Sequence, residues 1–175
     1  MTREIWIESV LDEMVAVGAK GLRIDALCSK LKVTKGSFYT HFSGKEDLLD
    51  QLIIYWSQTQ PDLVIGQIRA AHGQGLEPLA MMLRMSEERN VPRRDAAIRD
   101  WARYSDKAAK ALEVTDGLML SFMQEVLCKA GLDATDSFHF SRVLFLTSLG
   151  SEVAPWIETE EMMGFLAEKI AMAVS

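Results

Sequence analysis

The stretch 35–42 carries hydrogen-bonding side chains over most of its surface. Its two apolar residues, Phe38 and Phe42, stand four positions apart, which places both rings on one face of a helix. The other faces display polar side chains, namely Lys35, Ser37, Tyr39, Thr40 and His41. Ammonium, hydroxyl and imidazole groups on a slender helix can bond to phosphate oxygens and to base edges in the major groove of B-DNA. The pattern therefore predicts a helix with the chemistry of nucleic-acid recognition.

A second short helix and a turn would hold this helix in place. Ile24, Leu27 and Leu31 follow the spacing of one buried helical face over about two turns. Thr34 stands where an N-cap accepts a backbone N–H from residue 36 or 37. Two short helices joined by such a turn form a helix-turn-helix unit, whose second helix can enter a major groove.

Longer helices are predicted on both sides of this unit. Upstream, apolar residues at helical spacing over residues 2–17 predict a bracing helix that Gly18 ends. Downstream, Ser43 and Glu46 predict a capping box at the start of a bridging helix that Pro61 ends. The helix-turn-helix would thus be braced on one side and joined to the rest of the chain by a helix on the other.

Positive charge is concentrated around the same unit. The whole chain has 19 basic and 25 acidic residues and a net charge of −6, which argues against a protein that coats nucleic acid indiscriminately. Residues 20–45 have a net charge of +5, because Asp25 is their only acid, whereas the other residues sum to −11. A basic patch on an acidic protein predicts binding to DNA that is oriented and sensitive to salt.

Helical patterns continue through the remainder of the chain, and strand patterns are scarce. Helices are predicted over the following ranges: 62–71, 76–90, 93–110, 114–130, 136–152 and 159–173. We therefore predict an all-α fold, in which a three-helix head at residues 1–44 is joined by the bridging helix to a larger helical body at residues 45–175.

The helices predicted at 114–130 and 136–152 are more apolar than one buried face requires. In helix 114–130 the apolar side chains cover more than half of the circumference, whereas one buried face needs a stripe of about 100°. One face of each helix would pack inward, and the other would pack against a second copy in an isologous four-helix interface. The alternative is that a single chain covers both faces of both helices.

Composition limits the classes of protein to consider. The chain has 175 residues, 49% hydrophobic and 25% charged, as in folded proteins with a core. No apolar run reaches the roughly 18–20 residues of a membrane span, and no secretory segment opens the chain, so we expect a cytoplasmic protein. Cys28 and Cys128 lie far apart and predict buried free thiols. We expect neither a metal nor a cofactor, and the common sequence motifs of enzymes are missing.

Together these features resemble the TetR-type family of bacterial transcriptional regulators. The resemblance covers roughly residues 5–50 and is carried by Gly18, the helix Leu27–Leu31, Val33-Thr34-Lys35-Gly36, Phe38-Tyr39, His41-Phe42, Lys45-Glu46 and Leu48. It implies a homodimeric repressor whose heads bind a palindromic DNA operator. It also implies that the body carries dimerisation and binds a small-molecule effector that releases the operator.

The resemblance also assigns roles to single residues by position. It implies phosphate contacts for Thr34, Tyr39, His41 and Lys45, base-edge contacts for Lys35, Ser37 and Thr40, and close backbone approach at Gly36. Arg23 stands at the N-cap position of the first helix of the unit, but its side chain has no acceptor with which to cap the helix. Its guanidinium could reach a phosphate instead. Lys32 stands where the family favours glycine, and we expect a positive φ there.

An effector site is harder to place. The chain has ten Met residues, which are compatible with a plain core and with an adaptable apolar pocket. Residues proposed to line such a pocket are Met85, Trp101, Tyr104 and Phe122. Two other readings of the chain are a helical adaptor that binds proteins and a small-molecule-binding protein without sequence-specific DNA binding. Oxidation of Cys28, in the first helix of the helix-turn-helix, is a further way in which DNA binding could be disturbed.

Overall fold

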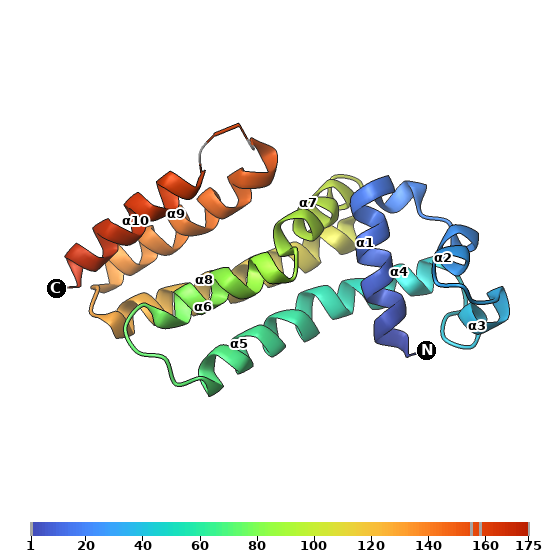
Figure 1. Cartoon of the computed structure of the whole chain (residues 1–175), viewed down its shortest axis with the longest axis horizontal. Helices are drawn as coiled ribbons and strands as arrows, with labels where there is room; N and C mark the ends of the chain where they lie inside the picture. The colour runs from blue at the N-terminus through green and yellow to red at the C-terminus, as the bar shows by residue number, and fades with distance from the viewer. Residues whose placement is uncertain (1, 155, 158, 175) are drawn as a thin grey trace. The chain divides into compact units, whose positions relative to one another are not determined.

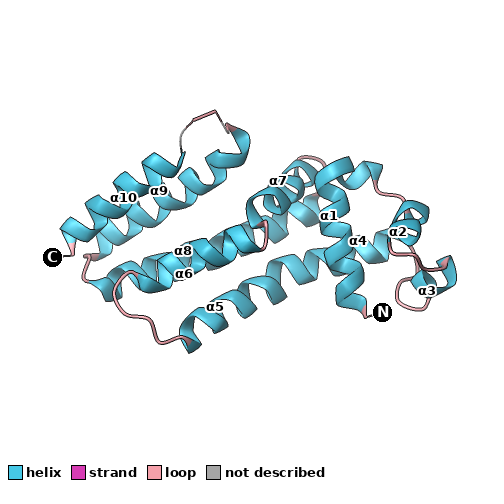
Figure 2. Ribbon diagram, viewed as in Figure 1, coloured by secondary structure: helices cyan, strands magenta, loops and turns pink. Residues whose placement is uncertain are grey.

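The computed structural model describes residues 2–154, 156–157 and 159–174. Over these residues the chain forms helices and no strand, which confirms the predicted all-α fold (Figure 2). The helices belong to two compact units, and Figure 1 labels them in chain order. Unit 1 comprises Met1–Gln60 and Arg93–Val114, and unit 2 comprises Pro61–Pro92 and Thr115–Ser175. None of the described helices combines the length and the apolar character needed to cross a membrane.

Unit 1 contains the predicted three-helix head. Its helices are α1 (Arg3–Gly21), α2 (Ile24–Lys30), α3 (Lys35–Tyr39), α4 (Lys45–Ile54) and the π-helical turn η1 (Tyr55–Thr59), with most of α7 (Val91–Ala102) and the first part of α8 (Asp106–Ala130). α1 contacts α2 and α4, and α2 contacts α3. Large buried side chains form its core, among them Trp6, Val10, Leu11, Met14, Leu27, Phe38, Phe42, Leu48, Leu52 and Ile98.

Single residues set the turns of the head as expected. Gly18 has a φ of 65°, a left-handed value that interrupts the helix, although a further turn continues to Gly21. Lys32 has a φ of 54°, which confirms the expected positive value in the turn after α2. Thr34 caps α3, because its Oγ1 accepts a hydrogen bond from the backbone N–H of Ser37 at 3.3 Å. These local predictions depend on neighbouring residues alone.

The predicted capping box lies one residue out of register. The N-cap of α4 is Gly44, so the third helical position falls on Asp47 rather than on Glu46. The Asp47 Oδ2 accepts hydrogen bonds from the backbone N–H of Ser43 at 2.8 Å and from its hydroxyl at 3.2 Å. Asp47 therefore supplies the carboxylate that Glu46 was predicted to supply, and α4 begins at Lys45.

Two further helix boundaries in unit 1 differ from the prediction. α3 ends at Tyr39 instead of residue 42, since the chain turns at Thr40 and His41 while Phe42 remains in the core. Pro61 does not end the bridging helix, because η1 is followed directly by α5 (Gln60–Ala70). The wider π turn lies immediately before the proline ring, at the point where proline cannot donate the regular hydrogen bond of an α-helix.

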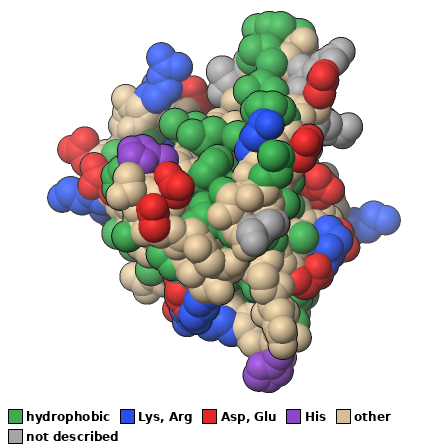
Figure 3. Space-filling view, turned by 90° about the vertical axis from the view of Figure 1, so that its left-hand side faces the viewer, with side chains coloured by type: hydrophobic (Ala, Val, Ile, Leu, Met, Phe, Trp, Pro, Cys, Tyr) green, Lys and Arg blue, Asp and Glu red, His purple; other side chains and the backbone are tan. Residues whose placement is uncertain are grey.

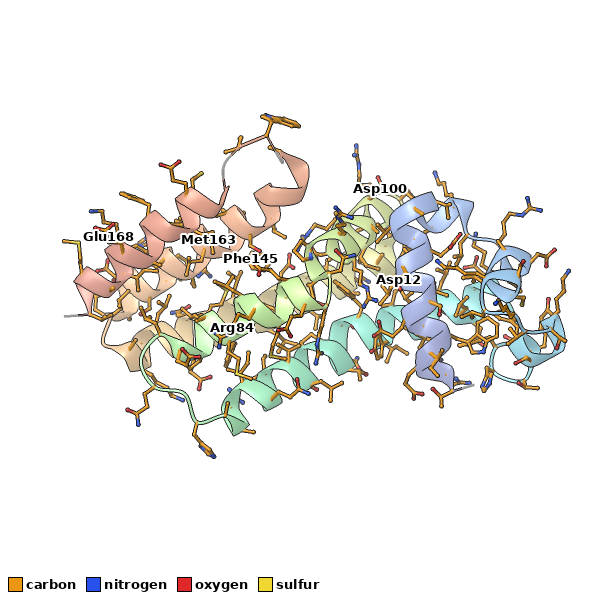
Figure 4. The ribbon with its side chains drawn as sticks, in the orientation of Figure 1. Asp12, Arg84, Asp100, Phe145, Met163 and Glu168 are labelled. Atoms are coloured by element: carbon orange, nitrogen blue, oxygen red, sulfur yellow. The ribbon has the colours of Figure 1, made fainter. Side chains whose placement is uncertain are left out.

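Unit 2 is a helical assembly with a continuous apolar core. It contains α5, α6 (Glu77–Glu88), the second part of α8, α9 (Ala134–Val153) and α10 (Thr159–Ala173). α9 and α10 contact each other as a hairpin, and Figure 4 labels Phe145 of α9 and Met163 of α10, two partly buried side chains that pack against the core. The buried members of the core of unit 2 include Ile68, Leu79, Met82, Phe122, Leu127, Leu144 and Ile170.

The single helix predicted at 93–110 is wrong, since the chain breaks between α7 and α8. The Ser105 Oγ accepts a hydrogen bond from the backbone N–H of Ala108 at 3.3 Å, and Asp106 begins the long helix α8. A serine three positions before the donor is an N-cap signal that apolar periodicity alone overlooks. The helix predicted at 114–130 is therefore the later part of α8, which spans 25 residues.

The compact units do not follow the predicted division at residue 44. The buried side chains of Leu48, Leu49 and Leu52 place α4 in unit 1, because these residues contribute to the core that α1 also lines. Arg93–Val114 also belongs to unit 1, although it lies far along the chain. The functional division into a DNA-binding head and an effector-binding body remains a prediction.

Candidate nucleic-acid interface

An aromatic cluster fixes the orientation of α3. The Phe38 ring is fully buried and meets Trp6 edge-on, with ring centroids 5.5 Å apart and an interplanar angle of 83°. The ring centroids of Phe42 and Phe38 lie 5.4 Å apart, and Phe42 is also buried. Since the apolar face of this stretch is held in the core, the polar side chains of α3 must occupy its other faces.

The predicted contact residues are accordingly accessible. Six of them are exposed, namely Arg23, Thr34, Lys35, Gly36, Tyr39 and Thr40, and three are partly buried, namely Ser37, His41 and Lys45. Tyr39 is 58% exposed although its ring edge touches Phe38, so its hydroxyl is available to solvent. The Thr40 hydroxyl donates its hydrogen bond to the Ser37 carbonyl at 2.7 Å, which leaves the Thr40 oxygen free to accept one from a base.

Lys45 has a structural role that the sequence did not indicate. Its Nζ donates hydrogen bonds to the carbonyl oxygens of Leu22 at 2.9 Å and Lys20 at 3.3 Å. These carbonyls lie where α1 ends and have no partner within that helix. Two of the three ammonium hydrogens are thus directed into the head, and at most one remains for the predicted phosphate contact.

Lys35 is paired in the free protein. Its Nζ lies 2.8 Å from the Asp25 Oδ1, so the first residue of α3 is joined to the first turn of α2. The hydrogen bond to Asp25 and the negative charge of this carboxylate raise the pKa of the Lys35 ammonium above its ordinary value. Lys35 is therefore fully protonated at neutral pH and is oriented by a specific partner.

Arg3 adds a cation to this surface. Its Nη2 donates a hydrogen bond to the backbone carbonyl of His41 at 2.6 Å, and its guanidinium lies 5.4 Å from the centre of the Phe42 ring. Arg3 is exposed. Sequence reasoning missed it because 38 positions separate the two bonded residues and no local pattern connects them.

Cys28 lies beneath the same two helices. Burial raises the pKa of the Cys28 thiol, and the nearby Asp25 carboxylate adds to the increase. The reactive thiolate form is therefore disfavoured, which weighs against a redox role for this thiol. Buried thiols were predicted at both cysteines, but Cys128 is exposed, so that prediction is wrong for the second one.

The residues predicted to line an effector pocket do not all fall in one unit. Met85 and Phe122 belong to the buried core of unit 2. Trp101 and Tyr104 belong to unit 1, where Trp101 is buried and Tyr104 is exposed. The Lys20 Nζ lies 4.0 Å from the centre of the Tyr104 ring, so this aromatic face already has a cationic partner.

Comparison with known proteins gives a match in the same part of the chain. Residues 10–52 match the family model of the bacterial regulatory proteins of the tetR family. The match runs from the middle of α1 into α4 and includes every predicted DNA contact from Arg23 to Lys45. Neither the curated proteins nor the solved structures yielded a match to this chain. The matched stretch is the part of the chain that forms the basic helix-turn-helix, so residues 10–52 are identified as a regulatory domain of the tetR type, which supports a DNA-binding transcriptional regulator.

Proposed function

We propose that this regulator is a cytoplasmic homodimeric repressor that binds a palindromic operator and leaves it when a small apolar effector binds. The observation that carries the proposal is the arrangement of α3, whose apolar face is locked on Trp6 while its polar faces remain exposed. In a two-fold dimer each α3 would enter one major groove, so the half-sites would lie about one helical turn apart or somewhat more.

Selection from a pool of random DNA duplexes tests this proposal most directly. The purified protein is incubated with the pool, and the bound duplexes are recovered and sequenced over several rounds. We expect enrichment of a near-palindromic sequence, because two identical heads read two identical half-sites. Recovery of no preferred duplex would contradict the proposal and favour an adaptor or a small-molecule-binding protein.

Two substitutions should separate phosphate contacts from base contacts. Tyr39→Phe removes one hydroxyl that faces the phosphate backbone, and we expect operator and unrelated duplexes to be bound more weakly by a similar factor of about 3 to 10. Thr40→Val removes a hydroxyl proposed to lie next to a base edge, at nearly constant volume. At one position of each half-site, we expect the affinity for the preferred base to fall about 10-fold relative to the other bases. Binding titrations against a panel of single-base operator variants measure both effects.

Lys45 is a less suitable test of phosphate contact. Removing its ammonium group also removes the hydrogen bonds to Lys20 and Leu22, so a weaker DNA affinity could reflect a less stable head. Tyr39 avoids this problem, because nothing that the structure describes bonds to its hydroxyl group within the head.

The proposed dimer interface is best placed on α9 and α10. The apolar side chains of α8 that suggested a twin are largely covered by unit 2 itself, as Phe122, Met123, Val126 and Leu127 are buried. By contrast, large apolar side chains remain exposed along α9 and α10: Val143, Leu146, Met162, Phe165 and Met172. Figure 3 shows hydrophobic side chains gathered in a band in the upper part of the view. An apolar surface of this kind is typical of a protein interface.

Leu146→Glu should therefore weaken dimerisation. Leu146 is 65% exposed in the single chain, so the substitution should leave the fold intact while it places an unpaired charge in the interface. We expect the dimer to dissociate at concentrations about 100-fold higher than for the unchanged protein, measured by analytical ultracentrifugation. Leu63→Glu is the matched control, because Leu63 of α5 is also exposed, at 48%, and lies outside α9 and α10. An unchanged dimer with Leu146→Glu would place the interface elsewhere.

An effector can release the operator only through a difference in affinity between two conformations. It must bind better to a conformation in which the heads are spaced wrongly for the operator. The stretch that would carry this change is the uninterrupted run of α4, η1 and α5, in which η1 is a π turn of the kind often found at functional positions. Release of a labelled operator by members of a library of small apolar compounds tests for such an effector.

A further inference from the structure

We propose that Asp25 sets the sequence selectivity of the head by holding the Lys35 ammonium group in a fixed position and by reducing its attraction to phosphate. This inference rests on the proposed binding of an operator through α3. It assigns a positioning role to an acidic residue that neither the local motif nor the charge pattern marks as a contact.

The position of the pair supports this role. Asp25 lies in the first turn of α2 and Lys35 is the first residue of α3, and 2.8 Å separates the Oδ1 and Nζ atoms. Both side chains are more than half exposed, at 59% and 62%. An ion pair this accessible contributes little to folding stability. Its effect must therefore be sought in the charge and the geometry that α3 presents to a ligand.

The charge distribution around the pair makes Asp25 distinctive. Residues 20–45 contain six basic residues and no acid other than Asp25. The carboxylate is bonded to Lys35, a residue proposed to reach base edges. A negative charge at this point opposes binding to the phosphate backbone, because phosphate contacts supply most of the affinity for non-specific DNA.

The geometry of the pair favours base reading over phosphate attraction. A free lysine side chain is flexible and can follow any nearby phosphate. When Asp25 accepts one of the three ammonium hydrogens, the other two point in restricted directions. Guanine offers two acceptors, O6 and N7, in the major groove, and a positioned ammonium group suits them. Asp25 would thus weaken non-specific binding more than operator binding.

The test is Asp25→Asn, which keeps the shape of the side chain and removes its charge. Operator and unrelated duplexes are titrated with the full-length protein at several salt concentrations. We expect affinity for unrelated DNA to rise about 3- to 10-fold and operator affinity to change less than about 2-fold, so that the specificity ratio falls. The salt dependence of non-specific binding should steepen by up to about 0.9 in log–log slope, as for one added phosphate contact.

Two controls make the result specific. Glu113→Gln removes the same net charge from the exposed surface of α8 and should leave the ratio unchanged. In a Lys35→Gln background, Asp25→Asn should change the ratio much less, since Asp25 acts mainly through Lys35 and only the general effect of its negative charge on phosphate remains. Persistence of the full effect in that background would overturn the positioning role.

The outcomes also separate this inference from the proposed function. If selection yields no preferred duplex, the proposed operator binding itself fails. If a preferred duplex exists and Asp25→Asn changes the specificity ratio no more than Glu113→Gln, operator binding stands and the role of Asp25 is refuted.

Discussion

Phe38→Ala should lower the free energy of unfolding of unit 1 by about 3–5 kcal/mol and abolish operator binding. The ring is fully buried between Trp6 and Phe42, with centroid distances of 5.5 and 5.4 Å. Its removal leaves a cavity at the point that locks α3 to α1, and the loss is of the same order as the whole stability of a small domain. Urea denaturation followed by tryptophan fluorescence measures the change, since Trp6 lines the cavity.

Tyr39→Ala is the matched control for this prediction. Tyr39 is the next residue in the chain and another aromatic, but it is 58% exposed. We expect its loss to change the free energy of unfolding by less than about 0.5 kcal/mol, while DNA affinity falls. Comparison of Phe38→Ala with Tyr39→Ala thus separates the effect on stability from the effect on contact with DNA. Native-like operator binding by Phe38→Ala would contradict the view that the aromatic cluster positions α3.

Arg94→Met should produce the second large effect, a loss of about 1–3 kcal/mol in the free energy of unfolding of unit 1. The Arg94 side chain is 16% exposed and pairs with two carboxylates of α1: Nη1 lies 2.6 Å from Glu8 and Nη2 lies 2.7 Å from Asp12. Figure 4 labels Asp12 on α1. We expect less than the full cost of breaking a buried pair, because half of the Asp12 side chain is exposed and water can solvate it.

The state of Arg94 explains why a neutral replacement should be harmful. Burial disfavours the charged guanidinium, but the hydrogen bond with Asp12 and the charge of Glu8 outweigh it and raise the pKa of Arg94. Without the guanidinium, Glu8 and Asp12 would lose the cation of α7 with which both of them pair. Glu8 also accepts a hydrogen bond from the hydroxyl of Tyr55 in η1, so the network joins α1, α7 and η1.

Two variants control the Arg94 prediction. Arg93→Met removes the same charge from the exposed neighbour and should leave stability nearly unchanged. Arg94→Lys should restore only part of the loss, because an ammonium point charge cannot bond both carboxylates with the geometry of a guanidinium. Thermal and urea denaturation of the three variants provide the comparison. Equal stability of Arg93→Met and Arg94→Met would show that the ion pairs to α1 contribute nothing.

The helix-turn-helix could be predicted closely because its features are local. The N-cap at Thr34, the positive φ at Lys32 and the interruption at Gly18 each depend on a few neighbouring residues. Burial of Phe38 and Phe42 follows from their spacing on one helical face. Even where the register was wrong, as in the capping box, the error was a single residue, from Glu46 to Asp47.

The bridging helix shows the limit of such reasoning. A proline inside a helical pattern ordinarily ends the helix, so the sequence predicts that the bridging helix ends at Pro61. In the structure η1 widens the backbone just before the ring, and helical residues continue into α5. A π turn has no clear sequence signature of its own, since its residues keep ordinary helical propensities.

Helical periodicity, capping residues and the charge contrast of residues 20–45 fixed the class of fold and the location of the DNA-reading helix. Tertiary packing decided which distant groups are in contact. Lys45 donates hydrogen bonds to the carbonyls of Lys20 and Leu22, Arg3 donates one to the carbonyl of His41, and Arg94 forms an ion pair with α1. These contacts join residues 23 to 86 positions apart. Periodicity tells which face of a helix is buried but not which helix covers it, because that choice depends on the shape and charge of the whole assembled core.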